Sequence, residues 1–188
     1  MADLYERQKE YYDRRAQEYD ATSWDLDSPE VAEIVAIVAA LPPARTLDVG
    51  CGTGYLSQHL RGDVTLLDQS AGMLAIASAR VPGAAVVQAD ALPLPFGDAS
   101  FDRVFSSHFY GHLRPSERRL FLAEARRVAR EIVLVEQNVG HGEGVERRAL
   151  ADGSEHEIYK VYFNAETLVA ELGEAEVLHA GAYVVARS

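Results

Sequence analysis

Cysteine and long apolar runs are the scarcest features of this sequence. Cys51 is its one cysteine, which excludes an internal disulfide framework and a metal site built from several cysteines. No stretch approaches the ~18 consecutive apolar residues that a membrane span needs, and residues 1–7 lack the basic start and apolar core of a secretory signal. We therefore expect a cytoplasmic protein with no membrane partner.

Basic residues are also in short supply. Lys and Arg total 18 against 29 Asp and Glu, a formal net charge of −11, whereas binding to nucleic-acid phosphates requires clustered cations. The arginines of residues 114–130 do cluster, but Glu117, Glu124 and Glu131 are interleaved with them, which favours a solvated helix face. A nucleic-acid partner is therefore not expected.

What the sequence does contain is enough apolar material for one globular domain. Hydrophobic residues make up 48% of its 188 positions, and no repeat, linker or low-complexity tract divides the chain. We predict a single domain over residues 1–188, with an N-terminal helical cap segment at 1–40 and a core at 41–188.

Helical and strand patterns alternate along the chain. Pro29 begins a helix, and Asn164 and Gly173 bound the last one. Alternating units of this kind fold as a doubly wound sheet with right-handed crossovers. Residues 137–157 are expected to be flexible. The expected helices are 3–20, 29–40, 115–129, 164–172 and one after each of the first two strands, and the expected strands are 45–50, 63–68, 84–89, 101–106, 132–135 and two within 175–187.

Three alternate glycines follow the first expected strand. Gly50, Gly52 and Gly54 can take positive φ and let the backbone approach a ligand, and a helical pattern resumes behind them. A dinucleotide fingerprint is G-x-G-x-x-G, whereas this turn is G-x-G-x-G, with its third glycine one position early. The spacing favours a nucleotide cofactor other than a dinucleotide.

A carboxylate accompanies each of the first three expected strands. Asp48 lies inside the first, Asp68 ends the second, and Asp90 follows the third in a turn of small residues. The carboxylate of Asp68 can accept hydrogen bonds from both hydroxyls of a ribose, an interaction that NAD enzymes also use. The alternative is that Asp68 caps the next helix, a role that Ser70 can equally fill.

The glycine turn and these three carboxylates together resemble the motifs of the class I S-adenosylmethionine-dependent methyltransferases. The resemblance covers nearly the whole chain and implies a Rossmann-like, mostly parallel seven-stranded sheet with an antiparallel C-terminal hairpin and helices on both faces. In that family the acid matching Asp90 accepts a hydrogen bond from the adenine amino group. The resemblance implies S-adenosylmethionine as cofactor, in contact with Tyr12, Tyr19, Asp48, Gly50, Cys51, Gly52, Gly54, Asp68, Gln69, Met73, Asp90, Ala91, Leu92 and Ser106.

Tyrosines recur every seven residues in the first expected helix, at Tyr5, Tyr12 and Tyr19. Residues 12–20 are similar to the Y-D-x-x-A-x-x-Y-D segment that precedes the core in many small-molecule methyltransferases, where it covers the cofactor and contributes to the acceptor pocket. We expect contacts from Tyr12 and Tyr19, because buried phenol groups seek polar partners. The alternative is aromatic packing on the sheet edge, which we expect for Tyr5. We likewise expect Cys51 to pack and not to act as a nucleophile.

Methyl transfer from a sulfonium is a backside displacement, so the protein must mainly align acceptor, methyl group and sulfur and exclude water. A base is needed only for a protonated acceptor. His108 and His112 are the catalytic candidates, because they follow the fourth expected strand and histidine titrates near neutral pH. In the family, the histidine matching His112 often only shapes the pocket. Glu136 either touches the acceptor or caps its strand in solvent, and no tight ligand spacing predicts a metal.

The sequence therefore predicts a methyltransferase for a small-molecule acceptor such as a quinone, phenol or amine. One alternative is methylation of a protein or tRNA, which the acidic charge disfavours. Another is a non-catalytic module that binds S-adenosylmethionine without acceptor chemistry. Monomer and homodimer are both compatible with the sequence, which identifies neither the acceptor nor the methylated atom.

Overall fold

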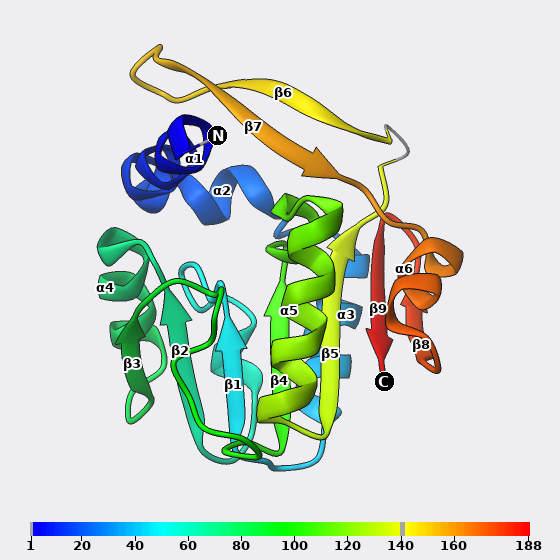
Figure 1. The fold of residues 1–188 in the computed structure, drawn as a ribbon. Helices are drawn as coiled ribbons and strands as arrows, with labels where there is room; N and C mark the ends of the chain where they lie inside the picture. Colours follow the sequence, from blue (N-terminus) through cyan, green and yellow to red (C-terminus); the bar gives the residue numbers. More distant parts are fainter. Residues whose placement is uncertain (1, 140–141) are drawn as a thin grey trace.

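The computed structural model describes residues 2–139 and 142–188, with side chains from residue 7 onward. A seven-stranded sheet lies at its centre, with helices on both faces (Figure 1). The strands are β1 (Thr46–Val49), β2 (Val64–Asp68), β3 (Ala85–Gln88), β4 (Arg103–Ser107), β5 (Glu131–Gln137), β6 (Glu143–Ala149), β7 (Glu155–Val161), β8 (Glu176–Ala180) and β9 (Tyr183–Arg187). The α-helices are α1 (Ala2–Arg15), α2 (Tyr19–Ser23), α3 (Pro29–Ala40), α4 (Ala71–Arg80), α5 (Pro115–Val128) and α6 (Ala165–Leu172), and the 3-10 helices are η1 (Ala16–Glu18), η2 (Ser57–His59) and η3 (Tyr110–His112).

The central sheet has the strand order β3-β2-β1-β4-β5-β9-β8. Its first five strands pair in parallel, and β9 runs antiparallel between β5 and β8. The expected doubly wound sheet with an antiparallel C-terminal hairpin is therefore confirmed. The chain leaves β1 toward β2 on one side and continues with β4 on the other, which makes the carboxyl ends of β1 and β4 the switch point where open α/β sheets bind ligands.

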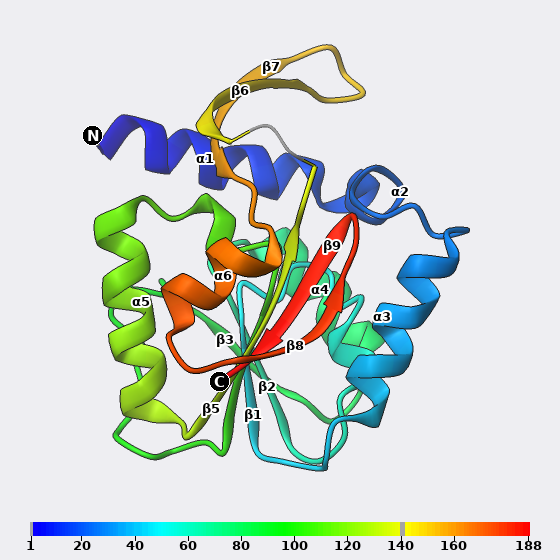
Figure 2. The same cartoon turned by 90° about the vertical axis from the view of Figure 1, so that its right-hand side faces the viewer.

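The central strands are apolar on both faces, as expected for a parallel sheet covered by two helix layers. In β5, Ile132 and Leu134 pack with α5 and α6, whereas Val133 and Val135 pack with α3 and α4. Figure 2 shows these two helix layers on opposite sides of the sheet. Helix α3, which the sequence placed in the cap segment, thus belongs to the packed core. The two buried cores fix the position of the carboxyl edge of the sheet.

The expected helix between the first two strands is not formed, and residues 50–63, all of them described, contain the short 3-10 helix η2 instead. These residues must carry the chain back along β1, about 13 Å for four residues at ~3.3 Å each. An α-helix rising ~1.5 Å per residue needs roughly nine residues for that return alone. The glycine turn at 50–54 and the loop at 61–63 leave only residues 55–60, which form a turn, η2 and the extended Leu60.

Residues 137–157, expected to be flexible, are mostly ordered as part of a β-hairpin, and only residues 140–141 lie outside the described structure. Strand β6 pairs antiparallel with β7, from Glu143 opposite Val161 to Ala149 opposite Glu155. In the connecting turn, the Asp152 carboxylate accepts a hydrogen bond from the backbone N–H of Ser154 at 2.9 Å. The sequence analysis did not predict these strands, which an Asx turn of this kind joins in register.

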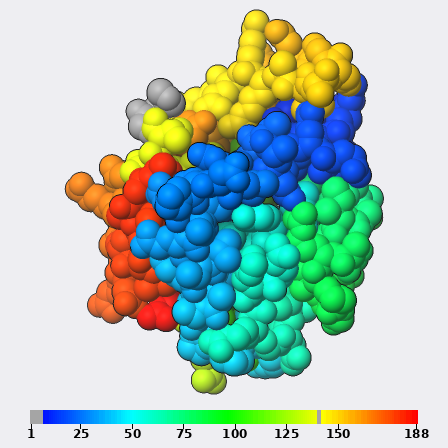
Figure 3. Space-filling model, turned by 180° about the vertical axis from the view of Figure 1, so that it is seen from behind, coloured from blue at the N-terminus to red at the C-terminus, as the bar shows by residue number. Residues whose placement is uncertain are grey.

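Helices α1 and α2 and the β6–β7 hairpin form a layer above the carboxyl edge of the sheet, which we call the cap (residues 7–23 and 142–161; Figures 1 and 3). Residues 3–20 were expected to be one helix, but α1 ends at Arg15 and η1 leads into α2. Tyr11, Leu150 and Ile158 form a buried cluster between α1 and the hairpin. Among the described residues, no helix combines the length and apolar character needed to cross a membrane.

Candidate functional site

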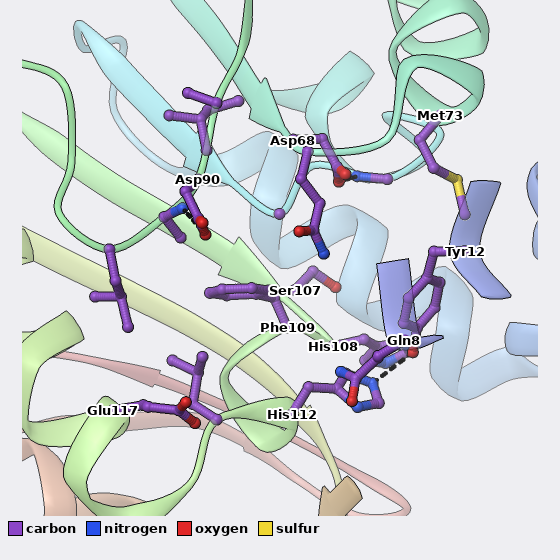
Figure 4. A pocket seen from close by; sticks show the side chains of 18 of the residues that line it. Gln8, Tyr12, Asp68, Met73, Asp90, Ser107, His108, Phe109, His112 and Glu117 are labelled. Carbon is purple, nitrogen blue, oxygen red and sulfur yellow. Dashed lines mark hydrogen bonds between the residues drawn. The ribbon is translucent and has the colours of Figure 1, made fainter. Parts of the chain in front are cut away.

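A cavity of about 380 Å³ lies between the cap and the carboxyl ends of β1 to β4 (Figure 4). We call the loops at these strand ends, residues 50–54, 68–73, 89–92 and 106–109, the floor. The cavity brings together most of the residues that the sequence singled out: Tyr12, Tyr19, Gly50, Gly52, Asp68, Gln69, Met73, Asp90, Ala91, Leu92, His108 and His112. Asp48, Cys51, Gly54 and Ser106 are not among the lining residues. The side chain of Tyr5 lies outside the described part of the chain.

The glycine turn brings backbone to the cavity wall. Gly50 and Gly52 adopt φ of 67° and 53°, a region that favours glycine. A Cβ on Gly50 would lie 2.5 Å from the Phe109 ring, whereas a Cβ on Gly52 would meet only the Tyr19 ring, at 3.8 Å. The glycine at position 50 therefore lets Phe109 pack closely against the backbone inside the floor. The glycine at position 52 leaves the backbone accessible to a ligand.

The Asp68 carboxylate is held by two backbone groups. Its Oδ2 accepts from Gly52 N–H and its Oδ1 from Ser70 N–H, each at 2.9 Å. The cap of α4 is Ser70, whose hydroxyl accepts from Met73 N–H at 3.1 Å, so capping does not explain Asp68. Burial raises the pKa of Asp68 above its usual range. Each carboxylate oxygen retains acceptor capacity for a ligand.

Asp48 lies beneath the glycine turn and not on the cavity wall. It is the penultimate residue of β1, so its side chain leaves the sheet face, where the Ser57 hydroxyl donates to its carboxylate. Burial raises the pKa of Asp48 to about 7. Gly54 is likewise structural, because a Cβ there would lie 3.3 Å from Ala77 of α4. The thiol of Cys51 packs against the α3–α4 core, and burial raises its pKa well above the usual value, which makes it a poor nucleophile.

The serine pair at the end of β4 is shifted by one residue from the expectation. Ser106 is fully buried, and its hydroxyl donates to the Val49 carbonyl at 2.8 Å. Ser107 lines the cavity instead, and its buried hydroxyl has no partner among the described residues. Successive strand residues face opposite sides, so the one-residue shift exchanges the two roles.

His112 forms a chain of hydrogen bonds across the cap. Its Nδ1 lies 2.8 Å from the carbonyl oxygen of Tyr159, and its Nε2 lies 2.7 Å from the Tyr12 hydroxyl (Figure 4). Burial lowers the pKa of His112 well below its usual value, so the ring is neutral. Because a carbonyl only accepts, Nδ1 carries the proton, and the Tyr12 hydroxyl donates to Nε2.

His108 is held in an unusual backbone conformation by aromatic stacking. Its φ is +58°, and its ring stacks on Trp24 with 4.2 Å between centroids and on Tyr183 with 5.6 Å. Burial lowers the pKa of His108 well below its usual value. Its Nε2 is buried without a hydrogen-bond partner among the described residues. A non-glycine residue held at positive φ with an unpartnered buried atom is typical of a functional position.

A second cavity, of about 720 Å³, lies under the hairpin and shares Tyr12, Tyr19, His108 and His112 with the first. Its wall includes three cations that no sequence motif marks: Arg15, Arg148 and Lys160.

Glu136 performs neither of the roles expected of it. It is fully buried and bonds Lys160 Nζ at 3.2 Å and Gly111 N–H at 3.1 Å. A lysine within the otherwise apolar and aromatic segment 158–163 was the signal for this pair, since a buried lysine needs a partner.

Comparisons with known proteins find similarity to methyltransferases. The family described as "Methyltransferase domain" matches residues 47–132. A demethylmenaquinone methyltransferase of Thermotoga maritima is 33% identical over 126 residues, which is 62% of this chain and 54% of that protein. A malonyl-[acyl-carrier protein] O-methyltransferase of Enterobacter lignolyticus is 44% identical over 78 residues, 38% of this chain and 31% of that protein. The chain thus spans about half the length, or less, of these curated relatives.

Among solved structures, the DhpI–SAH complex superposes with a TM-score of 0.83 at 29% identity, covering 100% of this chain and 97% of that one. The DhpI–SAM–HEP complex gives a TM-score of 0.82 at 28% identity, covering 98% and 96%. Both the cap and the sheet therefore have counterparts in a solved structure.

Proposed function

We propose that this chain methylates a small-molecule acceptor with S-adenosylmethionine as cofactor. The premise of the proposal is that the chain belongs to the class I S-adenosylmethionine-dependent methyltransferases. The observation that carries the proposal is the shared wall of the two cavities. The first cavity has the glycine turn, Asp68 and Asp90 on its floor, and His108 and Tyr12 separate it from the second. When bound, the cofactor supplies an electrophilic methyl group.

The floor fits a nucleoside cofactor. The open backbone at Gly52 and the remaining acceptor capacity of Asp68 suit a ribose with two adjacent hydroxyls. Asp90 lines the cavity beside the apolar side chains of Ala91 and Leu92, a combination that suits a flat ring with an exocyclic amino group. Ser107 adds a buried hydroxyl without a protein partner. These residues, with Gln69 and Met73, are the ones we propose to hold S-adenosylmethionine.

The residues between the cavities act on the acceptor. Nε2 of His112 is occupied by the Tyr12 hydroxyl, which orients the tyrosine oxygen and leaves its lone pairs available to a ligand. Nε2 of His108 has no protein partner. We therefore assign removal of a proton, where the acceptor carries one, to His108, and positioning of Tyr12 to His112. The lowered pKa of His108 keeps its ring neutral and able to accept a proton, but it also weakens the ring as a base. The cap covers both residues and limits access of water to the reacting atoms.

Transfer of labelled methyl groups from S-adenosylmethionine to a panel of small acceptors tests the proposal. We expect a labelled product with the native chain. His108→Gln should lower kcat for protonated acceptors by about 10²- to 10⁴-fold, the usual contribution of a general base, with a smaller loss for acceptors that need no deprotonation. Cofactor binding without transfer to any acceptor would instead favour the non-catalytic module.

Methylation of a protein or tRNA is the less favoured alternative. If RNA binds, its affinity should fall steeply with salt, and the net charge of −11 opposes such binding. A cytoplasmic location, a single domain over residues 1–188 and a monomeric or homodimeric state complete the proposal. Size-exclusion chromatography with light scattering tests the oligomeric state.

A further inference from the structure

Three cations converge on the second cavity although the chain as a whole is acidic. Arg15 comes from α1, Arg148 from β6 and Lys160 from β7, and all three line the same space of about 720 Å³. Arg15 is 8% exposed and Lys160 is 1% exposed. The wall also carries two acids, Glu18 and Glu146, so its cations outnumber its acids although the whole sequence has a net charge of −11.

Two of these cations have acidic partners. Lys160 pairs with Glu136 at 3.2 Å, and Arg148 binds one oxygen of Glu146 through Nε at 3.1 Å and Nη2 at 2.8 Å. The remaining acid on the wall, Glu18, accepts from the backbone N–H of Ala151 at 3.3 and 3.4 Å. The second terminal nitrogen of Arg148 has no such carboxylate contact among the described residues.

Arg15 has no carboxylate partner within residues 7–139 and 142–188. Its Nε and Nη2 donate to one hydroxyl, that of Thr22, at 3.3 and 2.8 Å. Its guanidinium lies over the ring of Tyr19, 4.9 Å from the centroid. A buried guanidinium needs a counter-charge to offset its lost hydration, and neither a hydroxyl nor a ring supplies a full negative charge. A bound anion would supply that charge.

A second observation also points to a ligand in this space. His108 lines both cavities, is 5% exposed, and has a buried Nε2 without a partner among the described residues. Tyr12 and His112 also belong to both walls. A ligand whose charged end lies in the second cavity therefore reaches the first cavity past the residue that we assign to proton removal.

We propose that the second cavity binds the anionic group of the acceptor through Arg15, Arg148 and Lys160, so that the substrate class is a small molecule bearing a phosphate, phosphonate or carboxylate group. The inference rests on the proposed function and specifies its acceptor. Arg15 and Arg148 contribute charged donors with unused hydrogen-bonding capacity, and Lys160 adds positive charge behind them.

The test uses the full chain saturated with S-adenosylhomocysteine and titrated in a calorimeter with inorganic phosphate. Trimethyl phosphate has the same tetrahedral centre without charge, and acetate and acetamide form the equivalent carboxylate pair. We expect phosphate or acetate to bind and both neutral analogues to give no measurable heat of binding. Arg15→Gln and Arg148→Gln should each weaken anion binding by about tenfold or more, as expected for a lost charge-assisted hydrogen bond.

Arg147→Gln is the matched control. Arg147 precedes Arg148 in β6, its side chain is exposed on the opposite face of the strand, and its replacement changes the net charge by the same amount. We expect the affinity of this variant for phosphate or acetate to change by less than twofold. Equal losses in Arg147→Gln and Arg148→Gln, or binding of neither phosphate nor acetate, would overturn the inference. Because Arg148 is partly exposed, its variant preserves the test if Arg15→Gln fails to fold.

Failure of this inference can be separated from failure of the proposed function. Acceptors supplied as anions and as their neutral methyl esters are compared in the labelled-methyl assay. Transfer to the neutral forms alone would contradict an anionic substrate and leave the methyltransferase proposal intact. Absence of S-adenosylhomocysteine binding to the folded chain would contradict the proposed function itself, and with it the inference.

Discussion

The floor and the cap enclose the same cavity but are built in different ways. In the floor, Asp68 and Gly52 are 16 residues apart, and a backbone N–H donates to a short carboxylate. At the cap, Tyr12 of α1 bonds His112 of η3, which is 100 residues away, and both partners are side chains. The floor depends on how a strand ends in a turn, whereas the cap depends on the packing of a helix against a hairpin from distant parts of the chain.

This difference separates the two halves of the proposed reaction. A site made of backbone and short side chains on consecutive strand ends has a geometry set by the sheet, which suits a constant ligand such as a cofactor. A site made of long side chains on a helix and a hairpin can change without disturbing the sheet. We therefore expect substitutions in the floor to affect cofactor binding and substitutions in the cap to affect the acceptor.

The largest expected effect is on the stability of the cap. In the native chain, the side chains of Lys160 and Glu136 are 1% and 0% exposed. The substitution Lys160→Met therefore leaves the buried Glu136 carboxylate opposite an apolar group. We expect the free energy of unfolding to fall by about 3–5 kcal/mol, the usual cost of an uncompensated buried charge. The double variant Glu136→Gln/Lys160→Met should recover most of the loss in urea denaturation. A loss below about 1 kcal/mol in the single variant would show that the pair does not support the cap.

The next effect is on the floor. Asp68→Ala should weaken S-adenosylhomocysteine binding by about 1.5–3 kcal/mol in calorimetry, because charged hydrogen bonds to the ribose are lost. Asp63→Ala is the control, since this carboxylate is exposed in the loop before β2. An unchanged affinity in a folded Asp68→Ala variant would limit Asp68 to holding the Gly52 backbone.

The strand beneath the floor should also differ from the residues that bond the cap in its response to pH. Asp48 has its pKa raised by burial to about 7, so the folded chain binds a proton that the unfolded chain has lost above about pH 4. The native chain should therefore lose stability relative to Asp48→Asn as pH rises from about 4 to 7, by at most about 1.4 kcal/mol per pH unit. Thermal unfolding across this range measures the difference, and a flat difference contradicts the buried carboxylate.

His112, which bonds the cap residues Tyr12 and Tyr159, should give the opposite slope. Burial lowers its pKa, so near and below pH 6.5 the unfolded chain binds a proton that the folded chain does not. The native chain should lose stability relative to His112→Gln as pH falls below about 6.5, again by at most about 1.4 kcal/mol per pH unit, until the folded-state pKa is reached. The same unfolding series provides the measurement. A slope of the same sign as that of Asp48 would refute the neutral histidine.

The smallest expected effect is that of a single hydroxyl. Tyr12→Phe keeps the ring and removes the hydrogen bond to His112 Nε2, 2.7 Å long in the native chain. We expect the free energy of unfolding to fall by about 0.5–1.5 kcal/mol, with little change in S-adenosylhomocysteine affinity. A strong loss of S-adenosylhomocysteine affinity would instead show that the Tyr12 hydroxyl contacts the cofactor.

The contrast between floor and cap also explains what could be predicted from the sequence. The sheet and the positions of Asp68 and Asp90 on the cavity wall follow from local patterns of strand, glycine turn and capped helix. Ser106 and Ser107 were exchanged, because a strand buried on both faces has no alternation to fix its register. Arg15 and Arg148 carry no local signal, since their convergence depends on the packing of α1 against the β6–β7 hairpin.

The central claim is that the floor binds S-adenosylmethionine and not a dinucleotide, and calorimetric titration of the full chain tests it most directly. S-adenosylhomocysteine and NAD are titrated in parallel, because Asp68 could bind the ribose of either ligand, whereas the G-x-G-x-G spacing differs from the dinucleotide fingerprint. We predict clear binding of S-adenosylhomocysteine and no measurable binding of NAD. Tight binding of NAD together with no response to S-adenosylhomocysteine would contradict the account.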